Sequence, residues 1–153
     1  MKISKVFRFE ASHILSRHPG KCSRLHGHSW VLRVSVEGPV DPAAGFVIDF
    51  GDISKIVNER VIDKLDHRHL GTWEHMFTLE ELLYHEHPLS HGWAPPEYPS
   101  DLYPTCENLL MWIGQRLLPD LVWSELELEE TSTSRATLTR EEFDAAIKAK
   151  EKK

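Results

Sequence analysis

Side chains capable of chemistry lie close together in the segment KCSRLHGHSW, residues 21–30. Cys22 precedes a His-Gly-His triplet that contains His26 and His28. Residues i and i+2 of a strand point to the same side, so the two imidazoles would project side by side. Imidazole nitrogens and thiolates are ligands that zinc prefers, and a thiolate is also a strong nucleophile. The segment is therefore compatible with a metal site, with a reactive thiol, and with two histidines that bond to backbone carbonyls.

A third imidazole could come from His13. Alternation in residues 3–13 predicts a strand, one face of which carries Phe7, Phe9, Ala11 and His13. Two histidines from one strand and one from a neighbouring strand would give the three-nitrogen set of a catalytic zinc, which leaves one position open. The alternative is that these histidines lie at the edge of the core and donate to carbonyl oxygens.

The loop around Cys22 is basic. It also contains Arg17, His18, Lys21 and Arg24. Positive charge lowers the pKa of a thiol from its usual value of about 8.5. Three roles for the thiol stay open: a fourth metal ligand, a base beside the metal, or a chemically inert residue. The basic side chains could bind a polyanion such as a phosphate ester, or could simply be solvated.

Two further places carry carboxylates suited to chemistry. Asp66 and His67 follow a predicted helix, and a carboxylate that orients an imidazole makes a better proton shuttle. The alternative is a histidine that interacts favourably with the end of the helix. Glu130 continues the apolar face of Leu126 and Leu128 in a predicted strand, where a carboxylate is costly unless it is paired. It could accept hydrogen bonds from a flat heterocycle such as a pterin or guanine, or lie in solvent beyond the sheet.

The apolar patterns predict the elements that would position these side chains. Strands are predicted at residues 3–13, 26–37, 121–131 and 135–139, and helices at 52–65, 105–118 and 139–153. Thr105 is a plausible N-cap, and Thr139 with Glu142 forms a capping box. The order of strands and helices predicts an α+β fold, in which an antiparallel sheet carries helices on one face.

Size and composition narrow the class of protein. The chain has 153 residues, of which 41% are hydrophobic and 27% charged, which predicts one soluble domain over 1–153. The net charge of −6 argues against nucleic-acid binding, and no apolar run is long enough to span a membrane. The start MKISKVFRFE lacks the apolar region of a signal peptide, and only two cysteines occur, so we expect a cytoplasmic protein without a disulfide scaffold.

Six ordered motifs carry a resemblance to a known family: FRFEASH, KCSRLHGHSW, GFVIDFGDI, LDHRHL, PTCENL and LEET. In this order they resemble the 6-pyruvoyl-tetrahydropterin synthase superfamily, over residues 3–70 and 104–135. The spacing of three residues between Cys22 and His26 resembles that of the 6-carboxy-5,6,7,8-tetrahydropterin synthases, the branch of the superfamily that serves queuosine and 7-deazaguanine biosynthesis. No nucleotide-cofactor motif of the GxGxxG or P-loop kind accompanies them.

The resemblance implies a tunnelling fold (T-fold), with a four-stranded antiparallel sheet and two helices packed on one face. It also implies a homohexamer, built as a dimer of trimers, with active sites at subunit interfaces. The implied substrate is 7,8-dihydroneopterin triphosphate, and the implied products are 6-carboxy-tetrahydropterin, acetaldehyde and triphosphate. The alternatives are a 6-pyruvoyl-tetrahydropterin synthase, a related lyase of pterin side chains, and a non-catalytic protein that binds zinc or pterin.

The resemblance also implies roles for ten residues. The implied zinc (Zn²⁺) ligands are His13, His26 and His28; the implied catalytic groups are Cys22, Asp66 and His67; and the implied substrate residues are Glu130, Thr105, Cys106 and Glu107. Cys106 stands where serine is more usual in the family. Residues 71–103 form an insert after the first helix, and the helix from 139 extends beyond the usual end. Such an insert could cover the pocket, alter contacts in the oligomer, or change the substrate.

Overall fold

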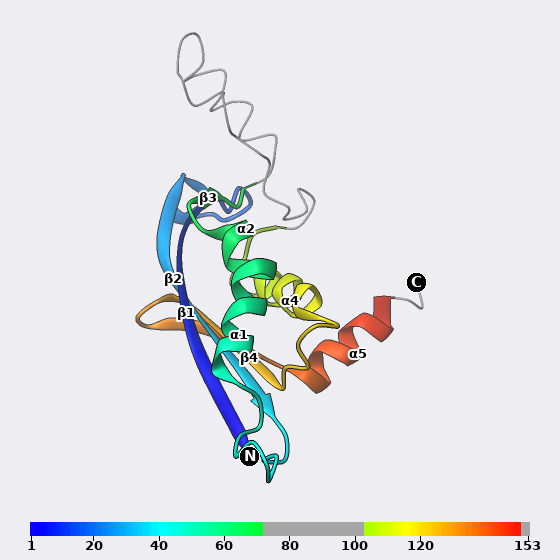
Figure 1. The fold of residues 1–153 in the computed structure, drawn as a ribbon. Coiled ribbons are helices and arrows are strands. Elements are labelled where there is room, and N and C mark those ends of the chain that lie inside the picture. Colours follow the sequence, from blue (N-terminus) through cyan, green and yellow to red (C-terminus); the bar gives the residue numbers. More distant parts are fainter. Residues whose placement is uncertain (72–102, 151–153) are drawn as a thin grey trace.

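The chain forms one sheet with helices on one of its faces (Figure 1). The structure is a computed structural model that describes residues 1–71 and 103–150. The strands are β1 (Lys2–His13), β2 (His26–Glu37), β3 (Arg68–His69), β4 (Glu125–Thr131) and β5 (Ser134–Thr139). The helices are α1 (Phe50–Val57), its π-helical continuation η2 (Asn58–Ile62), α2 (Asp63–Leu65), α4 (Cys106–Leu117) and α5 (Arg140–Lys150), with a 3₁₀ turn η1 (Lys21–Ser23).

The predicted α+β fold is confirmed, with one difference in the sheet. Its strand order is β3-β1-β2-β4-β5, so the described residues form five strands and not four. The four predicted strands pair antiparallel, whereas β3 pairs parallel to β1 through Ala11 with Arg68 and Ser12 with His69. A strand of two residues is too short for an alternating pattern, so the sequence alone does not reveal it.

The register of β1 and β2 sets the core and the candidate site. Phe9 pairs with Trp30, and His13 pairs with His26 at the end of the same ladder. The side chains of Phe9 and Trp30 are buried, and the indole of Trp30 donates to the carbonyl of Ala11 at 3.2 Å. The predicted apolar faces of both strands therefore face the helices, and each face ends in histidines.

Side-chain caps fix where the helices begin. The first helix begins at Phe50, two residues before its predicted start, because the carboxylate of Asp49 accepts from the backbone N–H of Gly51. Thr105 caps α4 as predicted, by accepting from the N–H of Asn108 at 3.4 Å. The predicted capping box of α5 also forms, since the backbone N–H of Thr139 donates to Glu142 at 2.9 Å.

The insert predicted at 71–103 lies outside the described residues except for its two end residues. The segment TLEELLYHEH predicts a short helix over 78–87 within it, and that helix also lies outside the described residues. Across residues 1–71 and 103–150, none of the helices has the length and apolar character needed to cross a bilayer.

Candidate metal and substrate site

Three histidines converge where β1 ends and β2 begins. His13 is the last residue of β1. His26 and His28 are the first and third residues of β2. One ligand atom from each lies within 4.8 Å of the other two, and Nε2 of His13 is 3.1 Å from Nε2 of His26. The predicted strand register thus brings the three rings to one point.

Backbone carbonyls orient two of these rings. Nδ1 of His13 donates to the carbonyl oxygen of Pro104 at 2.9 Å, and Nδ1 of His26 donates to that of Arg24 at 2.7 Å. A carbonyl oxygen can only accept, so each Nδ1 carries a hydrogen, and in the neutral ring the Nε2 then presents a lone pair to the centre of the cluster. This is the arrangement in which histidines bind metals, with a hydrogen-bonded second nitrogen that fixes the tautomer.

The cluster fits a metal cation. Two neutral Nε2 lone pairs 3.1 Å apart cannot share a hydrogen bond, and Nε2 of His28 is buried with no hydrogen-bond partner among the described residues. Burial lowers the pKa of His13 and of His28, which favours the neutral imidazoles that metals require. A set of three imidazole donors is one that a catalytic zinc uses.

Cys22 lies near this cluster in sequence but is not one of the converging ligands. Among the described residues, the group whose ligand atoms all lie within 4.8 Å consists of the three histidines. Cys22 sits half-buried in η1, and its carbonyl accepts from the N–H of Leu15 at 2.9 Å, which closes the loop between β1 and β2. The thiol is therefore separate from the histidine set in this structure.

Glu130 connects the histidines to a cavity of about 300 Å³. Its Oε1 lies 3.5 Å from Nε2 of His13 and 3.7 Å from Nε2 of His28. The cavity is lined by Leu15, Thr105, Cys106, Glu107, Glu130, Ser134, Arg135 and Ala136. All four residues that the resemblance assigned to the substrate therefore border one space.

Two of these four residues are chemically constrained. The hydroxyl of Thr105 caps α4, as described above. The thiol of Cys106 donates to the carbonyl of Leu128 at 3.2 Å, and burial raises its pKa to about 12. Cys106 thus stays protonated near neutral pH and is not a nucleophile there.

Asp66 and His67 contact each other through their side chains. Nδ1 of His67 lies 2.9 Å from Oδ2 of Asp66, while Oδ1 accepts from the backbone N–H of Glu10 at 2.8 Å. The Glu10 hydrogen bond, and secondarily His67, hold the pKa of Asp66 below its usual value, so it remains a carboxylate. His67 has a φ of 57° and donates its own N–H to the carbonyl of Glu10. Its side chain is 80% exposed.

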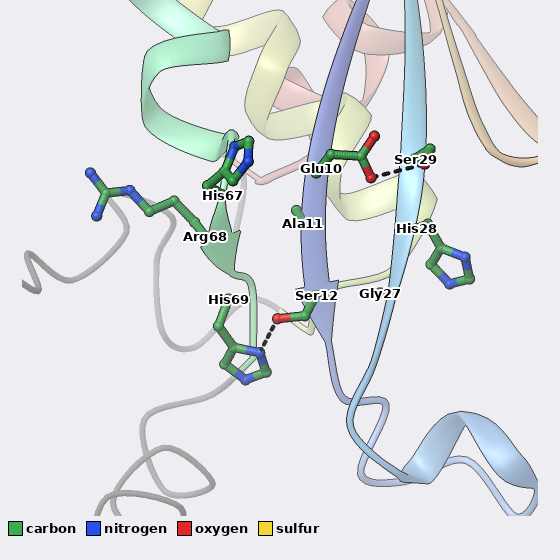
Figure 2. A pocket seen from close by; sticks show the side chains of 9 residues that line it. All are labelled: Glu10, Ala11, Ser12, Gly27, His28, Ser29, His67, Arg68 and His69. Atoms are coloured by element: carbon green, nitrogen blue, oxygen red, sulfur yellow. Dashed lines mark hydrogen bonds between the residues drawn. The ribbon is translucent and has the colours of Figure 1, made fainter. Parts of the chain in front are cut away.

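A second cavity, of about 480 Å³, extends over β3, β1 and β2 (Figure 2). His67 and His28 both line it, from the β3 side and the β2 side respectively. Between them, Glu10 accepts from the hydroxyl of Ser29 at 2.8 Å, and the hydroxyl of Ser12 lies 3.0 Å from Nδ1 of His69. The histidine cluster therefore borders this cavity through His28 and the first cavity through its neighbour Glu130.

Sequence reasoning missed the groups that hold the site in place. These are the carbonyls of Pro104 and Arg24 and the N–H of Glu10, and all three are backbone atoms. No side-chain pattern signals a backbone acceptor, because every residue carries one.

The fold and the histidine cluster together define a small α+β protein with a candidate three-histidine metal centre. The chain belongs to the 6-pyruvoyl tetrahydropterin synthase family, whose sequence profile matches residues 2–141.

Individual relatives come from two branches of pterin chemistry. The chain is 42% identical over 69 residues to the 6-carboxy-5,6,7,8-tetrahydropterin synthase of Haemophilus influenzae, an alignment that covers 43% of this chain and 49% of that protein. It is 28% identical over 148 residues to the 6-pyruvoyl tetrahydrobiopterin synthase of Pongo abelii, which covers 87% of both. The chain thus spans about half the length of the first relative and most of the second.

A solved structure shows the same fold. The 6-pyruvoyl tetrahydropterin synthase of Caenorhabditis elegans superposes with a TM-score of 0.69 at 24% identity, over 91% of this chain and 94% of that one. The enzyme of the same description from Plasmodium falciparum gives 0.62 at 20% identity, over 90% and 96%. These likenesses establish the T-fold.

Proposed function

We propose that this chain is a zinc-dependent lyase, a 6-carboxy-5,6,7,8-tetrahydropterin synthase. It would convert 7,8-dihydroneopterin triphosphate and one water into 6-carboxy-tetrahydropterin, acetaldehyde and triphosphate, in 7-deazaguanine and queuosine biosynthesis. The observation that carries the proposal is the contact of Glu130 with the histidine cluster, 3.5 Å from His13, at the border of the cavity with Thr105 and Glu107. A metal centre and a ring-binding carboxylate are thereby adjacent.

His13, His26 and His28 would hold the zinc. When bound, the ion would supply a Lewis acid that acidifies hydroxyl groups of the substrate side chain. The chain's own contribution is to favour the neutral form of His13 and His28 through burial, and to orient His13 and His26 through the carbonyls of Pro104 and Arg24.

Cys22 would act as the base that removes a carbon-bound proton of the substrate. Its separation from the histidine set supports this role, since a fourth protein ligand would close the site. Asp66 and His67 would take and return protons during tautomerisation and carbon–carbon cleavage. Asp66 is prepared for this role because the N–H of Glu10 keeps it ionised while its other oxygen orients His67.

Glu130 would anchor the pterin ring by accepting from its adjacent N–H groups, a geometry in which a carboxylate binds two donors. Its position in the cavity of about 300 Å³, a size suited to a small heterocycle, supports this role. The neutral thiol of Cys106 adds a weak donor and no charge to the same wall.

The second candidate is a 6-pyruvoyl-tetrahydropterin synthase. The alignment over 87% of both chains with such an enzyme supports it, but an alignment with a 6-carboxy enzyme at the same 28% identity covers 82% of this chain and 86% of that enzyme. That reaction releases triphosphate without consuming water and without breaking a carbon–carbon bond. A protein that only binds zinc or pterin would need neither Cys22 nor the hydrogen-bonded pair of Asp66 and His67.

Product analysis separates these candidates. The zinc-loaded protein is incubated with 7,8-dihydroneopterin triphosphate, and the products are identified by mass spectrometry. The proposal predicts acetaldehyde and a carboxy-pterin in equal amounts. Release of triphosphate with a pyruvoyl-pterin would assign the second candidate, and unchanged substrate would leave a binding protein.

We also propose a cytoplasmic homohexamer built from two trimers. The 80% exposure of His67 supports an assembly in which a neighbouring subunit covers the pair formed by Asp66 and His67. Light scattering in solution tests this proposal, and a particle with the 17.7 kDa mass of one chain would contradict it.

A further inference from the structure

A short segment before α4 ties together two parts of the site. Its first residue, Tyr103, accepts at its phenol oxygen from the backbone N–H of Arg17 at 2.7 Å. The guanidinium of Arg17 also lies over the Tyr103 ring, 5.4 Å from its centroid. The next residue, Pro104, holds His13 through its carbonyl oxygen. Tyr103 thus contacts the loop that carries Cys22, and the adjacent Pro104 contacts His13, a candidate metal ligand.

The segment is itself anchored to the core. The carbonyl of Tyr103 accepts from the backbone N–H of Thr105 and from the side-chain amide of Asn108, both at 2.8 Å. Both donors belong to the beginning of α4, whose residues Leu109 and Leu110 are buried. The start of α4 therefore holds the backbone of Tyr103, and the phenol of Tyr103 contacts the more exposed loop between β1 and β2.

Hydrogen bonds hold the loop between β1 and β2 in its position. It closes on itself through the N–H of Leu15 to the carbonyl of Cys22, and through the N–H of His18 to the carbonyl of Leu15. The first of these bonds joins Cys22 to the residue two positions after His13, and residues 16–21 between its two partners are exposed. The Tyr103 phenol bonds to Arg17 in the middle of that exposed stretch.

We propose that Tyr103 is a positioning residue, which sets the distance of Cys22 from the histidine cluster by holding Arg17. The same segment holds His13 through Pro104, so the thiol and the metal site share one reference point. This inference rests on the proposed role of Cys22 as the base. A displacement of about 1 Å of a reacting group can lower a rate by about 100-fold. The single hydrogen bond between Arg17 and Tyr103 can therefore affect the rate of the reaction.

The variant that tests it is Tyr103→Phe, which removes the acceptor oxygen and keeps the ring under Arg17. We expect the Arg17 amide to exchange with deuterium about 5- to 10-fold faster, as for loss of one hydrogen bond. We expect kcat to fall about 10-fold or more with little change in KM, while zinc content is unchanged. Alkylation of Cys22 should also change in rate, whereas the buried, protonated thiol of Cys106 should stay unmodified near neutral pH in both proteins.

Two control variants match this change. Ser54→Ala removes a hydroxyl that donates to the backbone carbonyl of Phe50 at 2.9 Å, far from the site in sequence, and should leave all five measurements unchanged. Arg17→Ala removes the guanidinium and keeps the backbone N–H that donates to Tyr103. The amide hydrogen of residue 17 should therefore still exchange slowly in this variant.

An unprotected Arg17 amide in the wild-type protein would overturn the proposal without any variant. So would faster exchange in Tyr103→Phe with unaltered kcat and unaltered Cys22 alkylation. If the wild-type protein shows no turnover, the proposed function fails, but exchange and alkylation still decide whether Tyr103 positions Cys22.

Discussion

Nε2 of His13 lies 3.1 Å from Nε2 of His26, and both rings donate through Nδ1 to carbonyl oxygens. The structure thus directs two lone pairs at each other across a partly buried space. Such a contact is unfavourable unless a proton or a metal ion lies between the nitrogens. The carbonyls of Pro104 and Arg24 therefore leave both Nε2 atoms directed at the space where a cation could bind.

The first prediction concerns the affinity for zinc. His28→Ala should weaken zinc binding by more than about 100-fold, since loss of an outer-shell partner alone costs 10- to 100-fold. Competition against a chelator of known affinity measures this change. His18→Ala is the matched control, because the imidazole of His18 accepts from the N–H of Gly20 within the loop and does not belong to the histidine cluster of the described residues. Equal zinc affinity in His28→Ala and wild type would remove His28 from the ligand set.

Local patterns in the sequence predicted much of the site. Alternation along β1 and β2 placed His13, His26 and His28 on one face, and the structure has them there. Position i and position i+2 of a strand share a side regardless of what surrounds them, so the inference needed no tertiary information. The caps at Thr105 and Thr139 were predictable for the same reason, since a cap involves neighbours three residues apart.

The features that escaped prediction depend on contacts between distant residues. Strand β3 exists because Arg68 and His69 meet β1, which lies more than fifty positions earlier in the chain. The orientation of the His13 ring depends on the carbonyl of Pro104, 91 positions away. Neither the pairing of two residues nor a backbone acceptor leaves a pattern in the sequence.

A second prediction separates the thiol from the metal. Cys22→Ala should keep the zinc content of the wild type and lower turnover by about 100-fold or more, because it removes a base and no ligand. Metal analysis and a turnover assay on the same preparation provide both values. Cys106→Ser should retain turnover, since serine can still donate to the carbonyl of Leu128. Loss of zinc from Cys22→Ala would instead make Cys22 a ligand.

The third prediction concerns pH and Cys106, whose pKa burial raises to about 12. Folding favours the neutral thiol, so above the ordinary thiol pKa of about 8.5 the unfolded chain loses a proton that the folded chain keeps. This thiol's contribution to stability therefore falls as the pH rises from about 8.5 toward 12. Denaturant unfolding between pH 8 and 10.5 should show a steeper loss for wild type than for Cys106→Ser. Parallel curves for the two proteins would contradict a raised pKa of the buried Cys106 thiol.

A fourth prediction concerns the pair formed by Asp66 and His67. Asp66→Asn removes the negative charge that orients and stabilises a protonated His67, so kcat should fall by about 100-fold or more. Zinc affinity and the thermal midpoint should stay near the wild-type values, because the amide oxygen can still accept from the N–H of Glu10. Asp63→Asn, three positions earlier in α2, serves as the control. Full activity in Asp66→Asn would exclude this pair from proton transfer.

The most direct test of a zinc-dependent lyase is a titration of metal-free protein with zinc while acetaldehyde release from 7,8-dihydroneopterin triphosphate is recorded. Turnover should rise linearly and reach its plateau at about one zinc per chain, as a single three-histidine site requires. His28→Ala should show no such rise at the same zinc concentrations. Acetaldehyde release by the metal-free protein at the rate of the zinc-loaded protein would contradict the proposed function.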